Sequence, residues 1–330
     1  MNAAEPTLHL SSGPHIHKGR TTQQIMWMVN LALVPALIWA TVIYGWKPAA
    51  LTIAAILGCL VAEQITCQLT KSRSTIMDGS AVCSGLLLAF TLPPGMPVWM
   101  PFVGGILAVF FAKSVFGGLG YNIFNVALVG RAMMMATFPV EMTTTWITPK
   151  VGNQAALDAI SGATPLAELK ARGVEGSLGA FTNSLETIDF FSTFVLGART
   201  GSIGEVSVIL VLLGAAFLLW KGIIKLFIPL SVIAGAALMA PFSDAPMIYM
   251  FAGGLWLGAF FMATDYVTSP STITGQIVFG LGIGLLTGII RNWGGYPEGI
   301  CYAILLMNIF TPALEDWFKP KRQALTGAPS

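Results

Sequence analysis

The sequence predicts an all-α polytopic membrane protein with ten transmembrane helices. Of its 330 residues, 55% are hydrophobic and only 10% are charged, whereas soluble domains carry about 25% charged residues. The mean hydropathy is +0.75. Apolar runs of roughly 20 residues, the length that a helix needs to cross the hydrocarbon core, recur along the chain. The net charge of +2 is too small to suggest a nucleic-acid partner.

The apolar runs form two groups of five, separated by one long polar segment. The first group lies near 24–45, 48–69, 80–98, 100–119 and 121–139, and the second near 203–220, 223–241, 247–264, 271–290 and 297–314. No small-residue cleavage site follows the first run, so we expect a retained span rather than a signal peptide. The expected organisation is a cytoplasmic amino-terminal segment 1–23, a first five-helix repeat 24–139, a loop 140–202, a second repeat 203–314 and a cytoplasmic tail 315–330.

The two groups of runs resemble internal repeats. A shift of 175 residues places Tyr121 on Tyr296 and Gly105 on Gly280, and it carries each run of the first group onto a run of the second. Because five is an odd number of spans, the second copy must enter the membrane from the opposite side. Inverted repeats of this kind are typical of transport folds, whose sites lie near the repeat interface. We therefore predict two inverted five-helix repeats.

The distribution of basic residues predicts the orientation, because short cytoplasmic loops are enriched in Lys and Arg. The side that holds the amino terminus receives Lys18, Arg20, Lys71, Arg73, Lys221, Lys225, Lys319, Lys321 and Arg322. The short loops of the other side hold Lys47 and Arg291. Both termini are thus expected in the cytoplasm of a bacterium. The loop 140–202 is then expected on the periplasmic side of the inner membrane.

Within that loop, residues 158–166 read DAISGATPL. The hydroxyl of Thr164 follows small residues, which hinder access little, and Pro165 restricts the backbone after it. Taken alone, such a segment is more often a plain surface turn. The alternative is a site where a large group is attached to Thr164.

The segment resembles the Asp-x-x-Ser/Thr-Gly-Ala-Thr signature at which flavin transferases esterify FMN phosphate to the final threonine. That signature belongs to membrane subunits of the Rnf and Na⁺-translocating NADH:quinone oxidoreductase complexes. Here Ala159 stands where glycine is usual, and the matching residues are Asp158, Ser161, Gly162, Ala163 and Thr164. Further resembling stretches follow in the family's order: SSGPHIHKGRTTQQIM, GSIGEVS, FFMATDYVTSP and YPEG. The short segment before the first span is similar to the D subunit of Rnf (RnfD) rather than to the longer B subunit of the quinone reductase.

The resemblance implies covalent FMN at Thr164, in a pocket that includes Ser161, Gly162 and Ala163. The predicted topology places four further candidates for this pocket on the same side of the membrane: Arg199, Ser202, Tyr296 and Glu298. Helix amino-termini on that side would favour a phosphate. Arg199 is either a charged fork for that phosphate or an interfacial anchor. Glu205 is either a helix-start carboxylate or part of the pocket.

A second group of candidates lies on the cytoplasmic side. Asn122 and Asn125 are three residues apart at the predicted start of the fifth helix, hence on one helix face. The resemblance implies that they hold a non-covalent riboflavin; helix capping with an interhelical hydrogen bond is the alternative. Asp265 is expected to line an ion path or to contact this inner flavin. Among other charges in apolar runs, Glu63 pairs with either Lys113 or Arg131, and the sequence does not choose between them.

The predicted function is a membrane electron-transfer subunit, coupling electron flow between ferredoxin and NAD to Na⁺ or H⁺ movement. The chain has no GxGxxG motif after a strand and no cysteine cluster, so partner subunits are expected to supply the NADH and iron–sulfur sites. The resemblance also implies a second covalent-FMN subunit and a flavin transferase as partners. A small-solute permease or channel, and a passive assembly scaffold, are the alternative functions. No catalytic or metal-binding residue is predicted in this chain.

Overall fold

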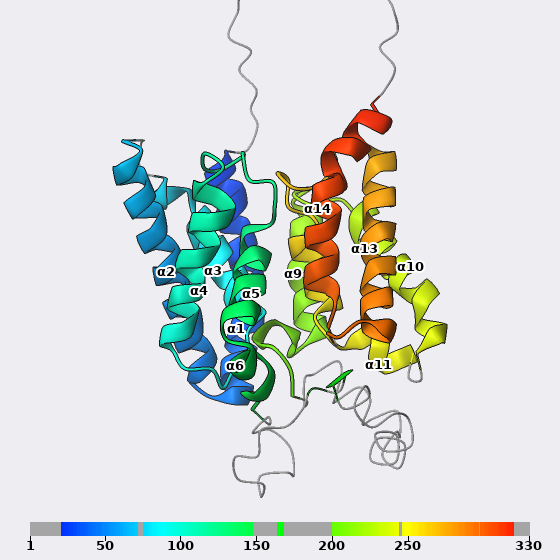
Figure 1. Ribbon diagram of the computed structural model, residues 1–330, viewed down its shortest axis with the longest axis horizontal. Coiled ribbons are helices and arrows are strands. Elements are labelled where there is room, and N and C mark those ends of the chain that lie inside the picture. The colour runs from blue at the N-terminus through cyan, green and yellow to red at the C-terminus, as the bar shows by residue number, and fades with distance from the viewer. Residues whose placement is uncertain are drawn as a thin grey trace, which may run out of the picture.

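The computed structural model is helical wherever it describes regular structure (Figure 1). It describes residues 21–71, 75–147, 164, 166–167, 200–243, 246–296 and 298–319. The all-α class is therefore confirmed for these residues. A helix occupies each of the ten apolar runs that the sequence predicts. By length and composition, three of the described helices could each cross a membrane unaided: α1, α2 and α13.

The first half of the chain runs from α1 to α6. Its elements are α1 (Thr22–Tyr44), α2 (Lys47–Leu69), η1 (Ile76–Asp78), α3 (Ser80–Phe90), α4 (Trp99–Val109), the π-helical turn η2 (Phe110–Ser114), α5 (Val126–Thr137) and α6 (Pro139–Thr144). Helix α1 begins with a capping box, in which Thr21 and Gln24 bond reciprocally to each other's backbone N–H groups. This closes the amino-terminal end of the first span.

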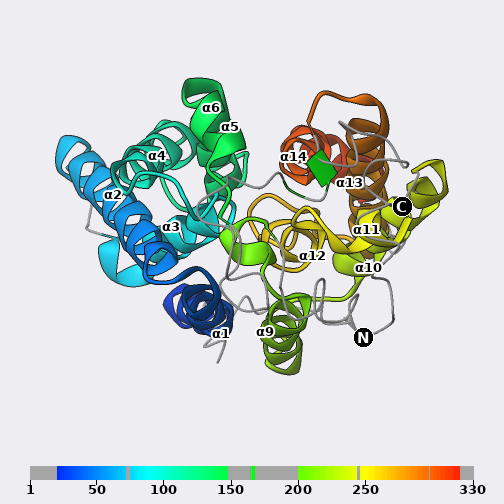
Figure 2. The same cartoon turned by 90° about the horizontal axis from the view of Figure 1, so that it is seen from below.

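The second half begins after the segment that contains Thr164. Its elements are η4 (Ile203–Glu205), α9 (Val208–Trp220), α10 (Phe227–Met239), η5 (Ala240–Phe242), α11 (Pro246–Phe251), α12 (Leu255–Leu257), the π-helical turn η6 (Gly258–Met262), α13 (Ile273–Trp293) and α14 (Ile300–Trp317). Seen from below, the two halves lie side by side (Figure 2), with α1 against α9 and α5 against α14. In Figure 1, α1 begins and α14 ends at the upper side of the molecule, whereas α6 lies at the lower side.

Three of the predicted runs are not continuous helices. The run 80–98 is helical only to Phe90, because the sequence TLPPGMP that follows contains three prolines and a glycine. The run 121–139 begins as a helix only at Val126. The run 247–264 is interrupted between α11 and α12, where Gly253 and Gly254 adopt φ of 75° and 66°. Proline and glycine shorten these helices despite the apolar composition around them.

Glycines bring the helix pair α2–α4 and the helix pair α10–α13 into backbone contact. A Cβ added to Gly58 would lie 2.1 Å from the Phe102 carbonyl oxygen, and one on Gly105 would lie 2.4 Å from that of Ala55. In the other pair, Gly235 meets the Leu281 carbonyl at 2.7 Å and Gly284 meets that of Val232 at 2.3 Å. The counterpart of Gly105 is therefore Gly284, one helical turn beyond the Gly280 that the 175-residue shift aligns with it.

Alanine at Gly58 or Gly235 is expected to destabilise the fold by about 1–3 kcal/mol, because the added methyl forces two backbones apart. The midpoint of thermal unfolding of the full chain in detergent measures this loss. Gly295→Ala is the matched control, since a Cβ added there would have nothing within 4 Å. Midpoints of Gly58→Ala and Gly235→Ala that equal that of Gly295→Ala would contradict the close-packing argument.

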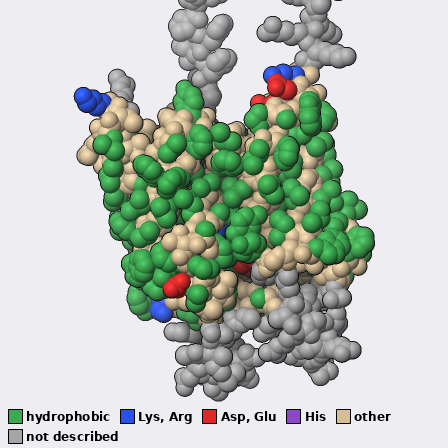
Figure 3. Space-filling model, viewed as in Figure 1, with side chains coloured by type: hydrophobic (Ala, Val, Ile, Leu, Met, Phe, Trp, Pro, Cys, Tyr) green, Lys and Arg blue, Asp and Glu red, His purple; other side chains and the backbone are tan. Residues whose placement is uncertain are grey.

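The surface of the helical body is apolar around its middle. Figure 3 shows hydrophobic side chains over the central part of the visible face, with charged side chains near its upper and lower ends. Large apolar side chains that are exposed include Leu31, Ile38, Ile53, Leu213 and Leu230. An apolar belt of this kind is the surface that lipid solvates. It agrees with the composition of the chain.

Candidate functional site

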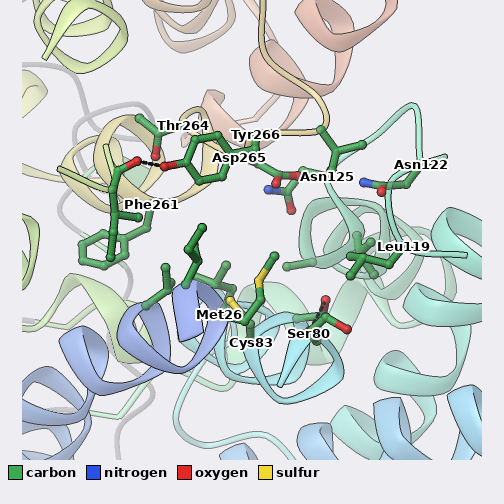
Figure 4. Close-up of a pocket in the computed structure, with 18 of the residues that line it drawn as sticks. Met26, Ser80, Cys83, Leu119, Asn122, Asn125, Phe261, Thr264, Asp265 and Tyr266 are labelled. Carbon is green, nitrogen blue, oxygen red and sulfur yellow. Dashed lines mark hydrogen bonds between the residues drawn. The ribbon is translucent and has the colours of Figure 1, made fainter. Parts of the chain in front are cut away.

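A cavity of about 90 Å³ lies between the two halves, and its walls bring together three predicted residues, Asn122, Asn125 and Asp265. Side chains of α1, α3, η2 and α9 also line it, together with Phe260 and Phe261 of η6. Figure 4 shows Ser80 and Cys83 of α3 on one side of this inner cavity and Asn125 and Asp265 across from them. Most of the lining is apolar, with few polar groups, as is usual in sites for small molecules and cofactors.

Asn125 has a structural role at this cavity. It is the N-cap of α5, its side-chain oxygen accepting from the Leu128 N–H at 3.3 Å. Its amide nitrogen donates to the Met262 carbonyl at 3.1 Å, which ties α5 to η6. The expectation that Asn122 and Asn125 share one helix face is wrong, because α5 begins only at Val126 and Asn122 precedes it. For Asn125, capping with an interhelical hydrogen bond is the observed arrangement.

Asn122 differs from Asn125 because part of its side chain is unpaired. Its nitrogen donates to the Phe124 carbonyl at 3.1 Å. The side chain is buried, and its oxygen has no hydrogen-bond partner in the described part of the chain. Leaving a buried acceptor unsatisfied costs about 1–3 kcal/mol. A donor on a molecule in the cavity would remove that penalty, so Asn122 is the stronger candidate ligand contact of the two.

Asp265 lies on the same wall, just after η6. Its carboxylate accepts from the Thr268 hydroxyl at 3.3 Å, and its backbone carbonyl accepts from the Ser269 N–H at 3.1 Å. The expected run of hydroxyls around this carboxylate is thus in place. The geometry puts Asp265 beside the inner cavity, as one of the two alternatives for it required.

A second, more polar cavity of about 520 Å³ adjoins the first. The two share Asn122, Thr264 and Tyr266, among other residues. Residues of α13 and α14 that sequence reasoning missed also line it, including Gln276, Asn308 and Glu315. They lie far from Asn122 in the sequence, and only the packing of the last two helices against the first half brings them near.

The two buried ion pairs settle which cations and carboxylates are partners. Lys113 of η2 pairs with Glu63 of α2, with 2.6 Å between Nζ and Oε1. Arg131 of α5 instead pairs with Glu298, which precedes α14, and it also donates to the Thr91 carbonyl. The Arg131–Glu298 pair therefore joins the two halves of the chain.

On the lower side, the predicted residues Ser202 and Glu298 line one small cavity with Arg131 and Glu205. Glu205 belongs to this cluster: its carboxylate accepts from the Ser202 hydroxyl at 2.8 Å and from the Gly253 N–H at 3.2 Å. The cavity measures about 20 Å³, close to the space of one water molecule. A flavin ring is far larger, so it would have to lie outside this cavity.

Tyr296 is not part of that cluster. Its ring is exposed and lies against Tyr302, with centroids 4.8 Å apart. Arg291, which the sequence suggested for a loop, is instead buried in the last turn of α13. It donates to the carbonyls of Ala252 and Gly253 at 3.1 and 3.0 Å, and so satisfies the break between α11 and α12.

Thr164 is buried, and its hydroxyl oxygen accepts from the Ala167 N–H at 3.3 Å. Leu166 is also buried and packs on Gly253, where a Cβ would lie 2.5 Å from its Cδ1. Because Gly253 also lines the small lower cavity, the segment of Thr164 lies against the second half near the Glu205 cluster. The other motif candidates lie outside the described residues: Ser161, Gly162, Ala163 and Arg199.

Comparison with known proteins gives the same family throughout. Residues 9–324 match the family described as NQR2, RnfD, RnfE. A Clostridium ljungdahlii protein, named as the D subunit of a proton-translocating ferredoxin:NAD(+) oxidoreductase complex, is 42% identical, with 94% of each chain covered. An Acetobacterium woodii protein, named as the D subunit of a Na(+)-translocating ferredoxin:NAD(+) oxidoreductase complex, is 42% identical over 98% of this chain and 97% of its own. An Escherichia coli protein, named as the D subunit of an ion-translocating oxidoreductase complex, is 34% identical over 94% of this chain and 97% of its own. The chain therefore belongs to the NQR2, RnfD, RnfE family.

Proposed function

We propose that the chain is a membrane electron-transfer subunit of an ion-translocating ferredoxin:NAD oxidoreductase complex. The observation that carries this proposal is the nearly full-length similarity to two relatives named as the D subunits of such complexes. The complex lies in the bacterial inner membrane, with both termini of this chain in the cytoplasm and the Thr164 loop in the periplasm. Partner subunits supply the iron–sulfur and NADH sites and a second covalent FMN. Equally similar relatives are named for H⁺ and for Na⁺, so similarity does not choose the ion.

The proposed architecture is ten membrane-spanning elements in two inverted five-helix repeats. The reciprocal glycine contacts of α2–α4 and α10–α13 support it, because each glycine has its counterpart in the other pair. The directions of the two halves agree with it, since α1 begins at the upper side and the first half ends with α6 at the lower side (Figure 1). Sites near the repeat interface are typical of inverted-repeat folds, and the inner cavity has this position.

The proposed cofactors are FMN, joined through its phosphate to the Thr164 hydroxyl, and non-covalent riboflavin in the inner cavity. The DAISGAT motif supports the first, and the apolar walls with the unpaired Asn122 oxygen support the second. When bound, the flavins supply the electron chemistry. Thr164 tethers one, Asn122 accepts a hydrogen bond from the other, and Phe260 and Phe261 exclude water from the cavity.

Analysis of bound flavins in the purified full chain, made together with a flavin transferase, tests the proposed function. Denaturation should release riboflavin, while the peptide that contains Thr164 should keep the added mass of an FMN phosphoester. A chain that carries no flavin of either kind would overturn the proposal. It would favour a permease or a passive scaffold built on the same helices.

Asn122→Ala is expected to lower the riboflavin content of the purified chain. The variant removes one acceptor for the ligand, which corresponds to about 1.4 kcal/mol, or roughly tenfold in affinity. Asn292→Ala is a matched control, because that partly buried amide donates to the Met239 carbonyl and is not among the residues that line the inner cavity. Riboflavin content equal in the two variants would remove Asn122 from the site.

A further inference from the structure

The buried ion pair Glu63–Lys113 presents its positive partner to the inner cavity. Lys113 and Glu63 are 4% and 3% exposed. Among described residues that line the cavity, Lys113 is the cation and Asp265 the carboxylate, whereas Glu63 lies behind Lys113 and does not line it. Lys113 also donates to the Ser80 hydroxyl at 2.9 Å, and Ser80 is a cavity residue. The cavity therefore has a positively charged, hydrogen-bonding edge.

The hydrogen bonds of this pair leave capacity unused on both partners. An ammonium carries three N–H donors, and Lys113 Nζ has two acceptors among the described residues, Glu63 Oε1 and Ser80 Oγ. Thr75 donates to the same oxygen, Glu63 Oε1, while the buried Oε2 has no partner in the described chain. A pair built only for stability would satisfy both carboxylate oxygens, because an unpaired buried oxygen is costly.

The backbone at Lys113 also departs from regular α-helix. Lys113 lies in the π-helical turn η2, and the aromatic residues Phe260 and Phe261 lie in the π-helical turn η6 on another wall of the cavity. π-Helical turns within helices occur frequently at functional sites, where an added residue changes the direction of a side chain. Both such turns in the described chain border this one cavity.

We propose that Lys113 is the counter-charge for the reducible ring held in the inner cavity, and that Glu63 is the positioning residue that holds and moderates it. The proposal rests on the riboflavin site proposed above. One electron passed to the ring from a flavin or iron–sulfur carrier of a partner subunit oxidises that carrier. When no proton follows, the ring gains one negative charge. The nearby ammonium stabilises that charge in a low-dielectric interior.

Redox titration of the non-covalent flavin in the full chain tests the proposal, in a Thr164→Ala background that removes covalent FMN. Lys113→Met removes the positive charge, so its midpoint potential should fall. We expect at least a tenfold change in the one-electron reduction equilibrium, which corresponds to about 59 mV. Glu63→Gln removes the opposing negative charge and should shift the potential upward. Lys113→Arg keeps the charge and should stay near the wild-type value.

Opposite shifts are the readout that a merely structural pair would not produce. Breaking a buried pair can unfold a protein, whereas replacing both partners by apolar residues is often neutral. The double variant Lys113→Met with Glu63→Leu therefore serves if the single variants fail to fold, and its potential should also fall. Lys319→Met is the control, because Lys319 forms an exposed pair with Asp316.

The outcomes separate the two proposals. If the Thr164→Ala chain contains no riboflavin at all, the proposed inner cofactor site fails. If it contains riboflavin but the potential is unchanged in Lys113→Met, Glu63→Gln and the double variant, only the role of Lys113 is overturned. Shifts of the same sign in Lys113→Met and Glu63→Gln would also overturn it, since the two substitutions change the charge in opposite directions.

Discussion

Thr164→Ala is expected to abolish covalent flavin on this chain. A phosphoester needs the hydroxyl oxygen, and alanine has none, so no transferase could form the bond at this position. The change is measured in the full chain made together with a flavin transferase. Denaturing gel electrophoresis should show a fluorescent band for the wild type and a dark band for the variant, and intact mass should differ by the attached FMN.

Two controls make this result specific. Thr164→Ser keeps a hydroxyl and should retain the fluorescent band. Thr200→Ala removes a hydroxyl from a described residue outside the DAISGAT motif and should leave the band unchanged. A Thr164→Ala chain as fluorescent as the wild type would place the attachment elsewhere and remove the main support for a covalent site.

Arg131→Met is expected to destabilise the fold by about 3–5 kcal/mol, because it leaves the Glu298 carboxylate without its cation in a largely buried site. Arg131 is 8% exposed, and it joins α5 to the loop before α14. Thermal unfolding of the full chain in detergent measures the loss as a lower midpoint. The exposed pair Lys319–Asp316 provides the control, where Lys319→Met should change stability by no more than about 1 kcal/mol.

The double variant Arg131→Met with Glu298→Leu tests the cause. Replacing both partners with apolar residues removes the uncompensated charge, so most of the lost stability should return. If Arg131→Met shifts the midpoint no more than Lys319→Met does, the Arg131–Glu298 pair does not hold the two halves together. Failure of the double variant to recover would assign the loss to the hydrogen bond with Thr91 instead.

The sequence predicted the helix-bearing runs well and several helix ends poorly. Hydropathy located a helix in every one of the ten runs, but it did not detect the early end of α3 or the late start of α5. Both errors have local causes that were visible in the letters. TLPPGMP cannot continue a helix, and three glycines with positive φ, Gly117, Gly118 and Gly120, precede Asn125, the cap of α5.

The candidate site was predicted in part. Asn122, Asn125 and Asp265 do share a cavity, but their roles differ, because Asn125 is committed to a helix cap and to Met262. Lys113 and Ser80 were not placed beside them. Their positions follow from the contact of α2 with α3 and α4, which no spacing in the sequence displays.

Hydropathy and helix-breaking residues act locally, so the sequence by itself determined that this protein is solvated by lipid, where its helices lie, and which family it resembles. Only the tertiary structure decided that Glu63 pairs with Lys113 and Arg131 with Glu298. A charge buried in an apolar interior takes whichever partner the backbones bring within reach. In this chain that approach is set by contacts such as Gly58 on Phe102 and Gly284 on Val232, between residues distant in sequence.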